Sequence, residues 1–146
     1  MKIKLTFFIL LSFFSTFIFA EELGNLSAQQ LISLQKNQKA LVIDIRTESE
    51  WAATGIIPDS HKLQFFSPRG KYDIKKWLFD LEQLKTTADQ PVILVCRSGS
   101  RSGMLGNMLS KQQGMKNIYH LSNGIMPWIK SGNEITPDCP TQLACK

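Results

Sequence analysis

One cysteine stands where a buried strand would end, in the stretch PVILVCRSGSRSGMLGNML. The apolar run before it stops at Cys96, and small or basic residues follow at once. They are Arg97, Ser98, Gly99, Ser100, Arg101 and Ser102. Because the next residues have a helical pattern, the N–H groups of a helix N-terminus would point back towards the cysteine.

This arrangement predicts nucleophilic chemistry at Cys96. An ordinary cysteine has a pKa of about 8.5, and its thiolate is the reactive form. Gly99 and the serines allow the backbone to curl with its amides inward, which favours an anion. Arg97 and Arg101 add positive charge, and arginine binds oxyanions bidentately. We therefore expect a covalent intermediate with an oxyanion-bearing substrate, bound by Arg97, Ser98, Gly99, Ser100 and Arg101.

The rest of the chain alternates between apolar runs and amphipathic segments. Short, nearly continuous apolar runs predict strands in 40–46, 91–96 and 117–121, and another after a turn in 56–66. Apolar spacing predicts helices over 26–38, 47–55, 72–84, 100–114 and 124–132. The pattern indicates an α/β fold with a mostly parallel central sheet of about five strands and helices on both faces.

Cap residues mark several of the expected helix boundaries. Ser27 and Asp73 are candidate N-caps, and Thr47 with Glu50 forms a candidate capping box. Gly55 follows the second of these helices and is expected to end it.

The carboxyl ends of parallel strands meet at one edge of the sheet, where sites form in open α/β folds. Cys96 ends one predicted strand there, and Asp44 and Arg46 end another. Structural ion pairs also occupy such clefts. We therefore expect Arg46 to pair with Glu48 or Glu50 and to brace the cysteine loop.

The segment CRSGSR, with Cys96 and Arg101 related as C-x4-R, resembles the six-residue active loop of rhodanese-type sulfurtransferases. Cysteine phosphatases use a longer C-x5-R loop, whose arginine position is taken here by Ser102. VIDIRTESEWAATGIIPDSHKL resembles the opening motif of the rhodanese family, and IYHLSNGIMPWIKSG its closing motif. Ile56 replaces the usual histidine of the opening motif, and Asn123 replaces the first glycine of the closing motif.

This resemblance implies a rhodanese-like three-layer fold and sulfurtransferase activity. Cys96 would take the outer sulfur of thiosulfate or a similar small anionic donor and hold it as a persulfide on the amides of residues 97–101. A thiol, small or on a protein, or cyanide would then accept the sulfur. Asp44, Arg46 and Ser102 would support the loop. The resemblance implies no metal and no organic cofactor, and we expect a monomer.

Other functions remain open. The chain could be a non-catalytic or persulfide-carrier module of the same fold, or a redox protein in which Cys96 bonds to a cysteine of the tail. Cys96 could also be a buried structural thiol. His61 and His120 lack metal-ligand spacing and are expected at the surface or in packing, and the three tryptophans in the core.

The N-terminal residues have the anatomy of a secretory signal peptide. Lys2 and Lys4 precede the apolar run Leu5–Phe19, and Ala20 is a small residue before an acidic pair. We expect a signal peptide at 1–20, a domain at 21–132 and a tail at 133–146, with export to a bacterial periplasm. A retained membrane anchor is the alternative, although about 15 apolar residues are few for a span.

Export has consequences for charge and for the remaining cysteines. Loss of the two leader lysines lowers the net charge from +5 to +3. The basic residues are dispersed, which favours neither nucleic-acid binding nor stable membrane association after cleavage. Cys139 and Cys145 lie close together in the tail and are expected to pair in an oxidising compartment. Two free thiols, or a bond to another chain, are the alternatives.

Intact mass measurement of the protein from cells tests the leader. We expect the mature chain to begin at Glu21, because cleavage after a small residue follows the apolar run. A mature protein that still begins at Met1 would contradict this prediction and favour the anchor.

Overall fold

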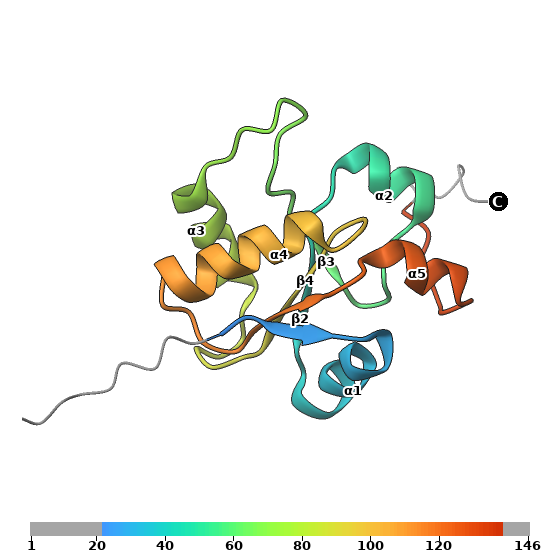
Figure 1. Cartoon of the computed structure of the whole chain (residues 1–146), viewed down its shortest axis with the longest axis horizontal. Coiled ribbons are helices and arrows are strands. Elements are labelled where there is room, and N and C mark those ends of the chain that lie inside the picture. Colours follow the sequence, from blue (N-terminus) through green and yellow to red (C-terminus); the bar gives the residue numbers. More distant parts are fainter. Residues whose placement is uncertain (1–21, 139–146) are drawn as a thin grey trace, which may run out of the picture.

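The strands form one sheet in which every neighbouring pair is parallel. The computed structural model describes residues 22–138, and the strand order is β1-β5-β4-β2-β3 (Figure 1). The strands are β1 (Gly24–Leu26), β2 (Leu41–Asp44), β3 (His61–Lys62), β4 (Val92–Val95) and β5 (Ile118–Leu121). The predicted parallel sheet of about five strands is confirmed.

Helices cover both faces because successive residues of a strand point in opposite directions. Val42 packs in a buried cluster with Leu31 of α1, and this cluster also contains α5 residues. Ile43 packs in a second cluster with Trp77 of α3, and that cluster also contains α4 residues. The result is three layers (Figure 1). The helices are α1 (Ala28–Gln38), α2 (Glu48–Thr54), α3 (Ile74–Leu84), α4 (Ser100–Asn107) and α5 (Ile125–Lys130).

The predicted caps are present. Ser27 forms a capping box with Gln30 at the start of α1, and Thr47 forms one with Glu50 at the start of α2. The Asp73 side chain accepts a hydrogen bond from the N–H of Lys76 in α3. These short-range bonds satisfy helix N–H groups and fix where each helix begins.

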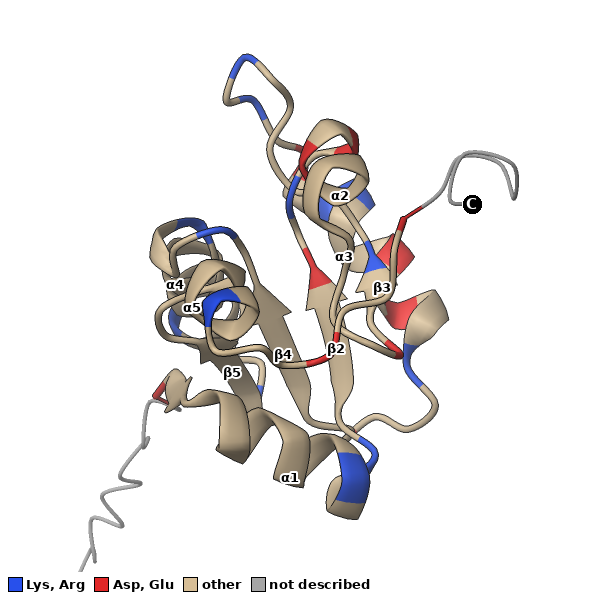
Figure 2. Cartoon of the chain, turned by 90° about the vertical axis from the view of Figure 1, so that its right-hand side faces the viewer, with Lys and Arg blue, Asp and Glu red and all other residues tan. Residues whose placement is uncertain are grey.

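The strands carry almost no charge within the sheet (Figure 2). Asp44 and Lys62 are the only residues of Asp, Glu, Lys or Arg type within the five strands. β2 and β4 are neighbours, and Asp44 pairs in register with Val95. Arg46 and Cys96, which follow these strands, therefore emerge at the same edge of the sheet, as expected from the sequence.

The structure differs from the expected elements in two places. β1 was not expected, and it adds an edge strand beside β5. The helix expected over 100–114 is α-helical only as far as Asn107 and continues as a π-helix (η1) over Met108–Gln112. Within η1, the Ser110 hydroxyl donates to the carbonyl of Gly106 at 2.9 Å, a bond of the kind that competes with the regular helix ladder.

Residues 133–138, the described part of the expected tail, are attached to the domain. Thr136 forms an antiparallel bridge with Ile56, and the carbonyl of Glu134 accepts a hydrogen bond from Trp128. Lys62 and Asp138 form an ion pair at 2.6 Å. The expected Cys139–Cys145 disulfide and the expected leader lie outside the described residues.

Among the helices of residues 22–138, none combines the length and apolar character that crossing a bilayer requires.

Candidate active site

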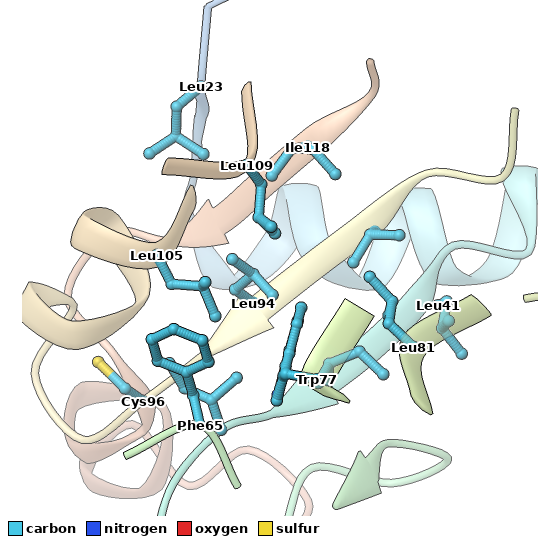
Figure 3. Packing of buried hydrophobic residues seen from close by; sticks show 13 residues of the cluster. Leu23, Leu41, Phe65, Trp77, Leu81, Leu94, Cys96, Leu105, Leu109 and Ile118 are labelled. Carbon is cyan, nitrogen blue, oxygen red and sulfur yellow. The ribbon is translucent and has the colours of Figure 1, made fainter. Parts of the chain in front are cut away.

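Cys96 follows β4 directly, and its side chain is fully buried. Its sulfur accepts hydrogen bonds from the N–H of Gly99 at 3.2 Å and from the N–H of Ser102 at 3.3 Å. The Ser102 hydroxyl lies 3.3 Å from the same sulfur. Cys96 also belongs to the apolar cluster on the α3 and α4 face, and Figure 3 shows it at one end of that cluster. Two N–H donors directed at a buried sulfur stabilise a negative charge there.

The turn after β5 holds the cysteine loop in place. The N–H of Ile125 donates to the carbonyl of Cys96 at 2.9 Å, and the N–H of Met126 donates to the carbonyl of Arg97 at 3.2 Å. Gly124 has φ of 68°, and a Cβ there would lie 2.4 Å from the Arg97 backbone. The start of α5 therefore binds the loop carbonyls from outside.

Gly99 is the second fixed point of the loop. It has φ of 91°, which L side chains rarely adopt, and it precedes α4 as its N-cap. A Cβ at this position would lie 1.8 Å from the carbonyl oxygen of Ser122. Ser100 and Arg101 follow in the first turn of α4, where N–H groups have no acceptor within the helix.

Arg101 binds Glu50 of α2. Its Nη1 lies 2.9 Å from Oε2 of Glu50, and its Nη2 lies 2.5 Å from Oε1. Glu50 also accepts a hydrogen bond from the N–H of Thr47, within the capping box of α2. Burial by itself would raise the pKa of Glu50, but the hydrogen bonds and charge of Arg101, together with the hydrogen bonds from Thr47, lower it to about 2. The pairing with Glu50 raises the pKa of Arg101.

Arg46 does not pair with the carboxylate of Glu48 or Glu50, so that expectation was wrong. Its guanidinium binds Asp44 through Nε–Oδ1 at 2.9 Å and Nη2–Oδ2 at 2.7 Å. It also donates to the carbonyl of Gly55 at 2.8 Å and to the hydroxyl of Thr54 at 2.7 Å. Both charged side chains are almost fully buried. Because Asp44 lies only two residues away, Arg46 folds back on it and ties the end of α2 to β2.

Arg97 has a different environment from Arg46 and Arg101. It is exposed, and within residues 22–138 it forms no ion pair. It lines a cavity of about 240 Å³ together with Arg46, Ser49, Glu50, Ala53, Thr54 and Met126. Cys96 does not line this cavity. Ser98 and Ser100 are also exposed, whereas Gly99 and Ser102 are buried.

His120 is buried in β5, as the packing interpretation expected, but both of its ring nitrogens have polar partners. Nδ1 lies 3.2 Å from the Ser102 hydroxyl, and Nε2 lies 2.7 Å from Oδ1 of Asn25. Residue types and spacing did not indicate a link between His120 and Cys96, because the link runs through Ser102, which is far from His120 in the sequence. The other partner of His120, Asn25, belongs to the unexpected strand β1. No group of three or more metal-ligating side chains occurs within the described part of the chain.

Comparison with known proteins places this site in a family. Residues 27–131 match the model of the rhodanese-like domain. The chain is 31% identical over 99 residues to a protein named Sulfurtransferase from Allochromatium vinosum, an alignment that covers 68% of this chain and 80% of that protein.

Two solved structures show the same fold. Rv0390 from M. tuberculosis has a TM-score of 0.64 at 21% identity, over 79% of this chain and 98% of that one. The polysulfide-sulfur transferase homodimer from Wolinella succinogenes has a TM-score of 0.60 at 21% identity, over 82% of each chain.

The Asp44–Arg46 pair generates a prediction about stability. Arg46→Leu should lower the free energy of unfolding by about 3–5 kcal/mol, because it leaves the Asp44 carboxylate buried without its partner. Lys76→Leu is the matched control, since Lys76 forms an exposed pair with Asp80 and should change stability by less than about 1 kcal/mol. Urea unfolding of both variants gives the comparison, and equal effects would contradict the assignment.

The Arg101–Glu50 pair predicts a pH dependence. A carboxylate with a lowered pKa stabilises the fold above its unfolded value, and this contribution disappears as the pH falls through the folded value. The difference in unfolding free energy between the wild type and Glu50→Gln should therefore be complete above the ordinary pKa of 4.5 and shrink towards a pH of about 2. Denaturant unfolding over this range measures it, and a difference independent of pH would contradict the pairing.

Proposed function

Because the chain belongs to the rhodanese-like domain family, we propose that it transfers sulfane sulfur from thiosulfate or a similar donor to a thiol or cyanide through a Cys96 persulfide. The observation that carries this proposal is the sulfur of Cys96 at the end of β4, with the N–H groups of Gly99 and Ser102 directed at it. The loop has the C-x4-R spacing, and the relative from A. vinosum is named a sulfurtransferase.

The first half-reaction forms the persulfide. The Cys96 thiolate attacks the outer sulfur of thiosulfate, a new S–S bond forms, and the donor's S–S bond breaks. Sulfite leaves with the electron pair of the broken bond. In the second half-reaction an acceptor thiolate or cyanide attacks the outer sulfur of the persulfide, and Cys96 leaves as a thiolate.

The loop supplies electrostatic support for both steps. The charge on the sulfur, or on the outer sulfur of the persulfide, is stabilised by N–H groups that are already oriented before the reaction. The first-turn N–H groups of Ser100 and Arg101 are further donors for an anion beside the loop. Arg97 is the arginine whose charge is directed to the donor, because Arg101 is engaged by Glu50.

Burial of the sulfur favours a persulfide carrier as the second candidate. Cys96 has an exposed fraction of 0% and lines no part of the neighbouring cavity. A donor can reach the sulfur only after the surrounding side chains or the loop move. A protein partner that induces this movement would deliver or collect sulfur faster than a small molecule does.

Thiocyanate formation from thiosulfate and cyanide tests the enzymatic proposal. We expect turnover by the wild type and its loss, by at least about 10³-fold, in Cys96→Ser, because the nucleophile is removed. The matched control is the double variant Cys139→Ser/Cys145→Ser, which removes the other two thiols and should keep the turnover.

Intact mass after thiosulfate treatment separates the two candidates. A gain of one sulfur atom that requires Cys96, together with turnover, supports the enzyme, whereas the same gain with negligible turnover supports the carrier. Activity that survives in Cys96→Ser would remove Cys96 from the mechanism. Loss of activity in the double tail variant, with a Cys96-containing disulfide in the wild type, would favour the redox protein.

A further inference from the structure

A line of hydrogen-bonding groups leads from the sulfur of Cys96 to the surface. The Ser102 hydroxyl lies 3.3 Å from Sγ of Cys96 and 3.2 Å from Nδ1 of His120. Nε2 of His120 lies 2.7 Å from Oδ1 of Asn25. The first three residues are buried, whereas Asn25 is exposed. The line therefore joins a sulfur without exposed surface to solvent.

Three different elements build this line. Cys96 follows β4, Ser102 belongs to α4 and His120 to β5. Asn25 lies directly opposite His120 in the register of β1 and β5. The α4 helix can approach the imidazole closely at Gly103, where a Cβ would lie only 3.2 Å from Cε1 of His120.

The partners define which groups carry protons. Oδ1 of Asn25 only accepts, so Nε2 of His120 carries a proton and donates it. In a neutral imidazole Nδ1 then accepts, and the Ser102 hydroxyl can donate to it. The carbonyl of Gly99, 3.1 Å from the same hydroxyl, is an alternative acceptor. A Cys96 thiol can in turn donate to the Ser102 oxygen.

We propose that Ser102 and His120 form a proton relay for Cys96. The thiol proton passes from Sγ to the Ser102 oxygen while the hydroxyl proton of Ser102 passes to Nδ1 of His120. One S–H and one O–H bond break, one O–H and one N–H bond form, and a thiolate and an imidazolium result. The reverse transfer returns the proton. His120 acts through Ser102 and is therefore a positioning residue.

The proposal rests on the proposed function, because a buried nucleophile must lose its proton before it attacks. A sulfur with no exposed surface cannot pass its proton directly to water, and Ser102 is the hydroxyl in contact with it. When an acceptor thiol removes the sulfane sulfur, the relay can also return a proton to Cys96.

The surroundings of His120 favour its neutral form at rest. Burial lowers the pKa of His120, and the backbone of Gly99 opposes this only in part. It faces Ser102 and Gly103 from α4, Asn25 from β1, and Leu94 of β4 in register. Within residues 22–138, Cys96 is the titratable group linked to it through these contacts. The neutral imidazole at rest is therefore available to take up the thiol proton through Ser102.

The rate at which iodoacetamide alkylates Cys96, followed against pH, tests the relay without any sulfur donor. The measurements use the Cys139→Ser/Cys145→Ser background, so that Cys96 is the one thiol. His120→Asn keeps an amide near the Nδ1 position but takes up no proton. We expect it to move the midpoint of the profile up by about one pH unit, which slows alkylation below the midpoint by about tenfold.

Two further variants give the proposal its specificity. Ser102→Ala should move the midpoint in the same direction, and His120→Asn on that background should add nothing, because the relay is already broken. Asn25→Asp should move the midpoint down, because a carboxylate stabilises the imidazolium and with it the thiolate. Coinciding profiles of the wild type and His120→Asn, or additive shifts of the two variants, would overturn the relay.

A measurement on the protein without substitutions at Ser102, His120 or Asn25 covers the case in which one of these variants does not fold. The ring nitrogens of His120, followed by NMR against pH, should show Nε2–H as the resting tautomer and a titration midpoint that changes when Cys96 is alkylated. Identical titrations before and after alkylation would contradict the coupling. Because neither readout needs sulfur transfer, absence of turnover alone would count against the proposed function and leave the relay standing.

Discussion

The direction of the peptide groups between Cys96 and Ser102 is the constraint on which the site depends. The N–H groups that start α5 bind the carbonyls of Cys96 and Arg97 from outside. Gly99 adopts a positive φ, and the Ser122 carbonyl leaves no room for a side chain there. With the carbonyls held outward, N–H groups face the sulfur. The contact between the β5–α5 turn and the loop thus explains why the loop and closing motifs occur together in one chain.

Two arginines that the sequence placed near the sulfur serve mainly to hold the elements around it. Arg46 joins β2 to the end of α2 through Asp44 and Gly55. Arg101 joins the first turn of α4 to Glu50, which already caps α2. Because α2 is bound on both sides, its position relative to the loop is fixed. In the described part of the chain, the positive charge left unpaired beside the loop is that of Arg97, rather than that of Arg97 and Arg101 together.

The sequence was informative wherever the deciding interaction is local. Strand β4 and the caps at Thr47 and Asp73 depend on residues within one turn or one run, and all were predicted. β1 was missed because three residues that include glycine and asparagine have little strand propensity, and they pair with β5 far along the chain. The partners of Arg101 and His120 depend on contacts between distant segments, which residue types alone do not define. The C-x4-R spacing identified the loop but could not show where its arginine points.

Burial of the sulfur protects it from solvent, but it also disfavours the thiolate form that reacts. A reactive thiolate is a target for oxidants, whose attack follows thiolate character and accessibility. Placing Cys96 in an apolar cluster removes it from solvent, but such a site disfavours both the charge and the departure of the proton. The inward N–H groups stabilise the charge on the sulfur, and the proposed relay of Ser102 and His120 provides a path for its proton. A persulfide formed there would be shielded by the same packing, so access for the acceptor, rather than reactivity of the sulfur, would govern how fast it is passed on.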